Sequence, residues 1–163
     1  MADTFEPRCD IRILVDADAC PVKEEIYKVA FRRKIPTTLV SNAYMRLPDH
    51  ALIERVVVSD GFDAADDWIA AEAGPLSVVV TADILLAERC VKAGAAVLAT
   101  NGKPFTADNI GGAVATRAIM ADLRVGADGD RAGGPAPFSK SDRSRFLSSL
   151  DEVLVRLERT ANR

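Results

Sequence analysis

Carboxylates follow three segments of the sequence that have the pattern of buried β-strands. These carboxylates are Asp16, Asp18, Asp63, Asp66 and Asp83. The first two come directly after the apolar run 11–15, and the last follows the run 77–81. The other two open a predicted helix that comes after a third run, 54–58. Because ligands of open α/β sheets bind at the carboxyl ends of the strands, we expect the five acids to share one edge of a sheet.

Several carboxylates in one cleft repel one another unless one is protonated or a cation offsets their charge. This set offers only oxygen ligands, and the sequence contains a single histidine, His50. Oxygen ligands favour Mg²⁺ or Mn²⁺, and such an ion could activate water and shield a phosphodiester during attack. An alternative stays open, since Asp63, Asp66 and the neighbouring Asp67 could simply cap the helix that they begin.

The elements that must position these acids alternate along the chain. The predicted strands are 11–15, 37–40, 54–58, 77–81 and 95–99, and the predicted helices are 22–33, 64–73, 84–93, 107–123 and 139–160. Pro21 is expected at the first helical position of the first helix, where its missing N–H costs nothing. Strands that alternate with helices through short connections predict an α/β fold, a three-layer αβα sandwich with a mostly parallel central sheet.

A single domain is expected to span residues 1–163, with three distinct segments at its ends. Residues 1–10 are polar and are expected to be a frayed lead-in. Residues 125–138 are rich in glycine and proline and are expected to form a loop, either a lid or a linker. The last predicted helix, 139–160, has apolar residues at helical spacing, so it must dock on the body or on a second copy in a homodimer.

Composition narrows the possible partners and environment. The 163 residues are 48% hydrophobic and carry a net charge of −3, so the whole chain offers no broad basic face. Cys9, Cys20 and Cys90 form no C-x-x-C pair, which argues against a disulfide framework, and one histidine makes zinc improbable. The early sequence has no apolar run long enough for a signal peptide or membrane span. We therefore expect a soluble cytoplasmic protein without a membrane partner.

The residues also carry a resemblance to a known family. The segment V-D-A-D-A-C-P-V resembles the opening signature of the YaiI/YqxD family of uncharacterised bacterial proteins, and later segments match further blocks in order. The matching segments are 15–22, 61–66, 80–87 and 133–139. The resemblance implies a PIN-like nuclease fold and Mg²⁺- or Mn²⁺-dependent hydrolysis of phosphodiesters, with RNA as the partner. A nuclease-derived RNA-binding protein that no longer cleaves is the second form of this hypothesis.

The resemblance also implies roles for individual residues. Asp16, Asp66 and Asp83 are expected to hold the metal, while Asp18 and Asp63 act through water or orient the attacking hydroxide. Asp67 lies outside the matching motif. The residues expected to contact the substrate phosphate or the acids are Ser41, Asn42, Arg46, Thr81, Lys103 and Arg143, and Arg117 is a further candidate for the nucleic-acid backbone.

Two other interpretations of the acids remain open. In a phosphoacceptor receiver domain, Asp60 would be the acceptor, flanked by Thr81 and Lys103, with Mg²⁺ held by the first acid pair. Against this, Ala17 separates the two first-strand acids, and the final 40 residues have no place in a lone receiver. A phosphatase with an aspartate nucleophile also uses a D-x-D segment, but a convincing lysine and downstream acid pair are absent. Metal binding alone does not separate the leading interpretations, whereas Asp60 and Lys103 do.

Overall fold

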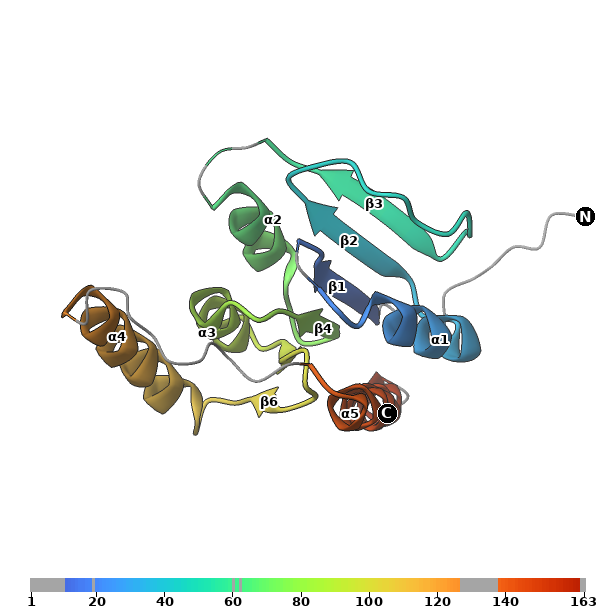
Figure 1. Cartoon of the computed structure of the whole chain (residues 1–163). Helices are drawn as coiled ribbons and strands as arrows, with labels where there is room; N and C mark the ends of the chain where they lie inside the picture. The colour runs from blue at the N-terminus through green and yellow to red at the C-terminus, as the bar shows by residue number, and fades with distance from the viewer. Residues whose placement is uncertain (1–10, 19, 60, 62, 127–137, 162–163) are drawn as a thin grey trace, which may run out of the picture.

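The computed structural model describes residues 11–18, 20–59, 61, 63–126 and 138–161 (Figure 1). The strands are β1 (Arg12–Asp16), β2 (Thr37–Ser41), β3 (Ile53–Val57), β4 (Ser77–Val80), β5 (Ala96–Leu98) and β6 (Pro104–Phe105). The helices are α1 (Lys23–Arg33), α2 (Ala64–Glu72), α3 (Ile84–Lys92), α4 (Ile110–Gly126) and α5 (Lys140–Ala161). The strands form one sheet in the order β3-β2-β1-β4-β5-β6. The first five run parallel, and β6 is antiparallel to β5.

The two faces of the sheet are covered by different helices. In β1, Ile13 and Val15 belong to a core shared with α1 and α5, whereas Leu14 belongs to a second core shared with α2 and α3. The cause is the period of two in a strand, which sends successive side chains to opposite faces. Both faces are therefore buried, and Figure 1 shows the sheet between the two helical layers. The predicted three-layer αβα sandwich with a mostly parallel sheet is confirmed.

The order of the strands defines where a ligand crevice opens. From β1 the chain builds outward through β2 to β3, and it then returns to the other side of β1 to place β4, β5 and β6. The order reverses between β1 and β4, which makes their carboxyl ends the topological switch point of the sheet. Val15 lies opposite Val80 in the β1–β4 register, so Asp16 and Thr81 lie at the same level of this edge.

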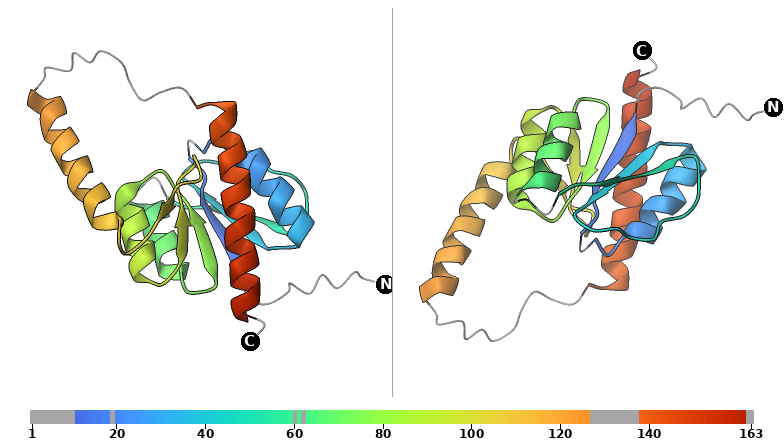
Figure 2. Two further views of the ribbon diagram at one scale, coloured as in Figure 1. Left: turned by 90° about the horizontal axis from the view of Figure 1, so that it is seen from below. Right: turned by 90° about the horizontal axis from the view of Figure 1, so that it is seen from above.

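The C-terminal helix α5 docks on the body of its own chain, as one of the two predicted alternatives. Its side chains Phe146, Leu150 and Leu154 are fully buried in the core shared with α1 (Figure 2). Its start carries a capping box, because the Asp142 amide donates to Ser139 Oγ at 3.1 Å and the Ser139 amide donates to Asp142 Oδ2 at 3.0 Å. These bonds lower the pKa of Asp142.

An ion-pair cluster also fastens α5 to the end of α1. Arg32 Nη2 and Arg33 Nε each lie 2.6 Å from Asp151 Oδ1, and the hydrogen bond from Arg33 is the main cause that lowers the pKa of Asp151 to about 2. Because its pKa is depressed in the folded protein, the ionised carboxylate of Asp151 stabilises the fold. This stabilisation is complete above the ordinary aspartate pKa near 4 and is lost as the pH falls through about 2.

We expect Asp151→Asn to lower the melting temperature at pH 7 by about 2–4 °C, the effect of about 1 kcal/mol for a surface ion-pair cluster. The difference from the wild type should shrink below pH 3, where the wild-type carboxylate also takes up a proton. Thermal denaturation by circular dichroism at several pH values measures it. A loss of stability that is constant from pH 7 to pH 2 would show that the charge of Asp151 is not the cause.

Three local details differ from the sequence-based expectations. Pro21 does not open α1; Val22 is its N-cap and Lys23 its first residue, so the proline belongs to the preceding turn. The helix expected from residue 107 begins at Ile110, after a turn in which the Thr106 hydroxyl accepts from the amide of Asn109. The short strand β6 was not predicted, because two residues are too few for a periodic pattern.

Helix α4 extends away from the sheet (Figure 2). It packs on the body through Ile110 and Val114, whereas residues 115–123 are all exposed. Residues 1–10 and most of the expected loop 125–138 lie outside the described residues. In the described part of the chain, no helix is long and apolar enough to cross a membrane.

Candidate functional site

Asp16 is the last residue of β1 and lies half-buried at the switch point. The hydroxyl of Thr81, which is 1% exposed, donates to Asp16 Oδ2 at 2.9 Å. The same hydroxyl oxygen accepts from the backbone amide of Asp83 at 2.9 Å. Thr81 therefore fixes the carboxylate of one acid and the backbone of another, and it couples the ends of β1 and β4.

Asp83 is the N-cap of α3. It therefore has the capping role that the sequence left open for Asp63, Asp66 and Asp67. Its Oδ1 accepts from the amides of Leu85 and Leu86 at 2.9 and 3.3 Å. Both amides are unsatisfied donors of the first helical turn, and their bonds fix the side chain in one direction. The cap does not remove Asp83 from the acid group, because its charge raises the pKa of both Asp16 and Asp66.

Asp66 reaches the same edge from the first turn of α2. Its pKa is raised to about 6 by burial, then by the charges of Asp83, Asp16 and Asp63, and by a hydrogen bond with Asp83 that favours the protonated form. The pKa of Asp16 is also raised, mainly by burial and further by Asp83 and Asp18. Acids from three separate segments therefore act electrostatically on one another, with Asp16 influenced by Asp83 and Asp18, and Asp66 by Asp83, Asp16 and Asp63.

Asp18 and Asp63 form the outer part of this acid group, and both are exposed. Asp18 Oδ2 accepts from the backbone amide of Asn42 at 3.0 Å, which joins the loop after β2 to the site. Asp63 has a left-handed backbone with φ of 63° and makes no side-chain cap bond, so it does not serve α2 as a side-chain cap. Asp67 turns away and forms a 2.8 Å ion pair with Arg89. This contact separates Asp67 from the five acids.

The chemistry of the donor set fits a hard divalent cation better than any other common metal. All five donors are carboxylates, and the pKa of Asp66 is raised first by burial and then by the charges of Asp83, Asp16 and Asp63. As the side chains stand, no three His, Cys, Asp or Glu residues of the described chain are close enough together to hold an ion. A coordination shell that includes Asp16, Asp66 and Asp83 is therefore not preformed.

Several other predicted contact residues are engaged in contacts within the protein. Ser41 is buried, and its hydroxyl donates to the carbonyl of Ala43 at 2.6 Å. Arg143 Nη1 donates to the carbonyl of Pro21 at 2.6 Å and to Glu25 Oε1 at 3.0 Å, so it ties α5 to the start of α1. At Asn42 it is the backbone amide that contacts an acid. These contacts hold the segments that lie next to the acids in the sequence and in the sheet.

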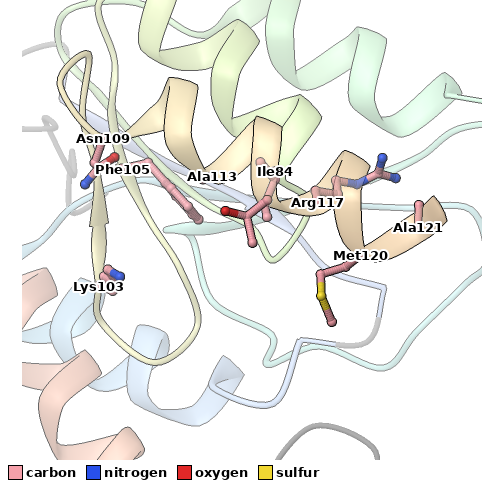
Figure 3. A pocket seen from close by; sticks show the side chains of 9 residues that line it. Ile84, Lys103, Phe105, Asn109, Ala113, Arg117, Met120 and Ala121 are labelled. Atoms are coloured by element: carbon pink, nitrogen blue, oxygen red, sulfur yellow. The ribbon is translucent and has the colours of Figure 1, made fainter. Parts of the chain in front are cut away.

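A cavity of about 610 Å³ opens beside the acids, between α3, β6 and α4 (Figure 3). Its lining residues are Ile84, Lys103, Phe105, Asn109, Ala113, Thr116, Arg117, Met120 and Ala121. The first of these directly follows Asp83, so the cavity adjoins the acid group. Figure 3 shows Lys103 and Arg117 at different ends of the group of lining side chains. The sequence pointed to the two cations but not to the cavity, because the cavity depends on how α3, β6 and α4 pack together, which no local pattern specifies.

The chain has close relatives among known bacterial proteins. Residues 14–156 match the model of the family described as "Uncharacterized BCR, YaiI/YqxD family". A UPF0178 protein of Sphingopyxis alaskensis is 69% identical over 147 residues, which cover 90% of this chain and 95% of the relative. UPF0178 proteins of Nitrobacter winogradskyi and Jannaschia sp. are 56% and 57% identical, over 91% and 95% of this chain and 94% and 99% of the relatives.

No solved structure matches this chain. The PIN-like relationship therefore stays a prediction, while the layers and strand order come from the structure itself. The names of these three relatives state no activity. What the site does must be argued from its own chemistry.

Proposed function

This chain belongs to the YaiI/YqxD family, and we propose that it is a divalent-metal-dependent hydrolase of RNA phosphodiesters. The observation that carries the proposal is the mutual electrostatic influence of carboxylates from three segments at the carboxyl edge of the sheet, where the pKa of Asp66 rises to about 6. Such a group is costly for the fold unless a proton or a cation offsets it, and perturbed acids of this kind cluster at functional sites.

In this proposal Asp16, Asp66 and Asp83 hold Mg²⁺ or Mn²⁺. The bound ion supplies an activated water and neutralises charge on the phosphate. Thr81 keeps the Asp16 carboxylate in place through its 2.9 Å hydrogen bond, and the N-cap bonds of Asp83 limit its rotation. Asp18 and Asp63, which are exposed at the rim, orient the attacking water and accept its proton.

Cationic side chains that line cavities support the proposal that the substrate is a polyanion. Lys103 and Arg117 line the cavity that adjoins Asp83, and Arg46 lines another cavity on the loop after β2. With a net charge of −3, the chain must attract nucleic acid through such local groups and not through its overall charge. Each cavity thus offers a cationic side chain for an RNA backbone.

The order of the strands favours the hydrolase over the receiver alternative. Asp60 lies outside the described residues, but β3, the strand that precedes it, is at the edge of the sheet and is separated from β1 by β2. An acceptor that shares Mg²⁺ with Asp16 and Asp18 would have to follow a strand next to β1. If Asp60→Asn abolished a mass increase produced by a small phosphodonor with Mg²⁺, the receiver interpretation would regain support.

The proposal is tested by titrating Mn²⁺ against the wild type, Asp16→Asn and Asp67→Asn. We expect Mn²⁺ to raise the wild-type melting temperature, by about 5–10 °C at a hundredfold excess over the dissociation constant, and to start cleavage of single-stranded RNA. Asp16→Asn should lose both responses. Asp67→Asn is the matched control, because Asp67 pairs with Arg89 outside the acid group, and it should keep them. Equal RNA stability in all samples, with no effect of metal on melting, would refute the proposal.

A further inference from the structure

The loop after β2, residues 42–52, carries an exposed aromatic ring beside the acid group. Tyr44 is 73% exposed, more than any other large hydrophobic side chain in the described part of the protein. The loop is joined to the site by the hydrogen bond from the Asn42 amide to Asp18. Tyr44 is two residues further on, so its Cα lies within about 7 Å of the Cα of Asn42. The backbone that carries the ring therefore lies two residues from the amide that contacts Asp18.

Arg55 of β3 covers one face of this ring. Its guanidinium carbon lies 4.2 Å from the ring centroid of Tyr44, and its Nε donates to the carbonyl of Met45 at 3.2 Å. Met45 and Leu47 pack on the core shared with α1 and α5. The arginine, the loop and the core thus hold the ring in one position, so a ligand that stacks on it finds a preorganised surface.

The surroundings of the ring have the chemistry of a nucleotide site. Tyr44, Arg46 and Arg55 line a cavity of about 630 Å³ on the same loop. An aromatic ring with one face covered by a guanidinium and the other open to solvent suits a nucleobase, because every base has a π face that can stack on it. Arg46 adds a second guanidinium to the cavity, and this group suits the phosphate that flanks such a base.

We propose that Tyr44 and Arg55 form a stacking platform for an unpaired nucleobase of single-stranded RNA, with Arg46 bound to the adjoining backbone. This inference rests on the proposed function, since it places the base next to the phosphodiester that the acids cleave. It makes the enzyme selective for single strands, because a base within a duplex is already stacked on its neighbours. It also predicts little preference among the four bases.

Binding is measured by fluorescence anisotropy with a labelled single-stranded oligoribonucleotide in Ca²⁺. We expect Tyr44→Ala to weaken binding about tenfold, within the range of base–aromatic stacking, and Tyr44→Trp to restore it. Leu123→Ala is the matched control, since Leu123 is 58% exposed on α4 and lines neither cavity. In cleavage assays with Mn²⁺, Tyr44→Ala should raise KM and leave kcat unchanged.

An oligomer of the same length in which abasic sites replace the bases separates stacking from charge. Tyr44→Ala should not change its binding, whereas Arg46→Ala should weaken binding of both oligomers. If Tyr44→Ala bound the normal oligomer as tightly as the wild type does, the platform would be overturned. The same conclusion would follow if this variant bound both oligomers more weakly by the same factor. Cleavage by the wild type in the same preparations reports on the proposed function separately, so failure of the platform and failure of the nuclease are distinguishable.

Discussion

Replacing Asp66 by asparagine is expected to stabilise the metal-free protein at neutral pH and to abolish cleavage of RNA. Asparagine keeps the shape of the side chain and removes a negative charge that burial disfavours and that Asp83, Asp16 and Asp63 repel. After allowance for solvent screening at this half-exposed position, we expect a gain of about 1 kcal/mol, or about 2–4 °C in melting temperature. On the proposed function the variant would also lose a metal ligand, and with it about 4 kcal/mol of transition-state stabilisation, or about a thousandfold in rate.

The pH dependence identifies the cause of this gain. In the folded protein the pKa of Asp66 is about 6, above its ordinary value of 3.8, so between these values the folded state binds a proton that the unfolded state lacks. The penalty is therefore absent below about pH 4, grows as the pH rises and is complete above about pH 6. We expect Asp66→Asn to have the same melting temperature as the wild type at about pH 4 and a higher one at about pH 7.5.

Divalent metal should reverse the order of the melting temperatures of the wild type and Asp66→Asn. Mn²⁺ binds the wild-type carboxylates and raises its melting temperature, whereas Asp66→Asn should respond weakly. Asp67→Asn serves again as the control, because removal of its exposed ion pair with Arg89 should neither stabilise the protein nor change the metal response. A lower melting temperature for Asp66→Asn at neutral pH without metal would show that the carboxylate is compensated inside the fold, and would weaken the case for a metal.

The layers of the fold were predictable because local patterns encode them. The run 11–15 is apolar at nearly every position, and the structure shows why: Ile13 and Val15 enter one core and Leu14 the other. Ser139 and Asp142 likewise indicate the start of α5 within four residues, through backbone donors that only a nearby side chain can satisfy. Signals of this kind need no knowledge of the rest of the chain.

Carboxylates at one edge were predictable for a related reason, and Thr81 and Asn42 were among the residues expected to contact the phosphate or the acids, but which acid each would bond was not predictable. Parallel strands bring their carboxyl ends to one edge, so acids that follow β1 and β4 must meet there once those strands are neighbours. Which hydroxyl would fix Asp16 depends on the register of Val15 with Val80, and no local pattern specifies that register. Arg143 illustrates the same limit. Its charge suggested a phosphate contact, while its bonds to Pro21 and Glu25 depend on how α5 docks.

The docking of α5 depends on a glycine in the turn between β5 and β6. Gly102 is buried and has a φ of +87°, a conformation that side chains rarely adopt. A Cβ at this position would lie 2.8 Å from the carbonyl carbon and oxygen of Arg145 and 2.9 Å from the Cα of Phe146. These neighbours are backbone atoms of α5, so they cannot rotate away as the end of a side chain could.

We therefore expect Gly102→Ala to destabilise the protein by about 3–4 kcal/mol, from left-handed strain and overpacking together, and to lower the melting temperature by about 10 °C. Gly112→Ala is the matched control of opposite sign. Gly112 lies within α4, and a Cβ added there would meet nothing within 4 Å, so alanine should add about 0.5–1 kcal/mol through helix propensity. Thermal denaturation of both variants measures the contrast. If Gly102→Ala melted like the wild type, α5 could not pack against this turn, and its apolar face would have to be buried on a second copy of the chain.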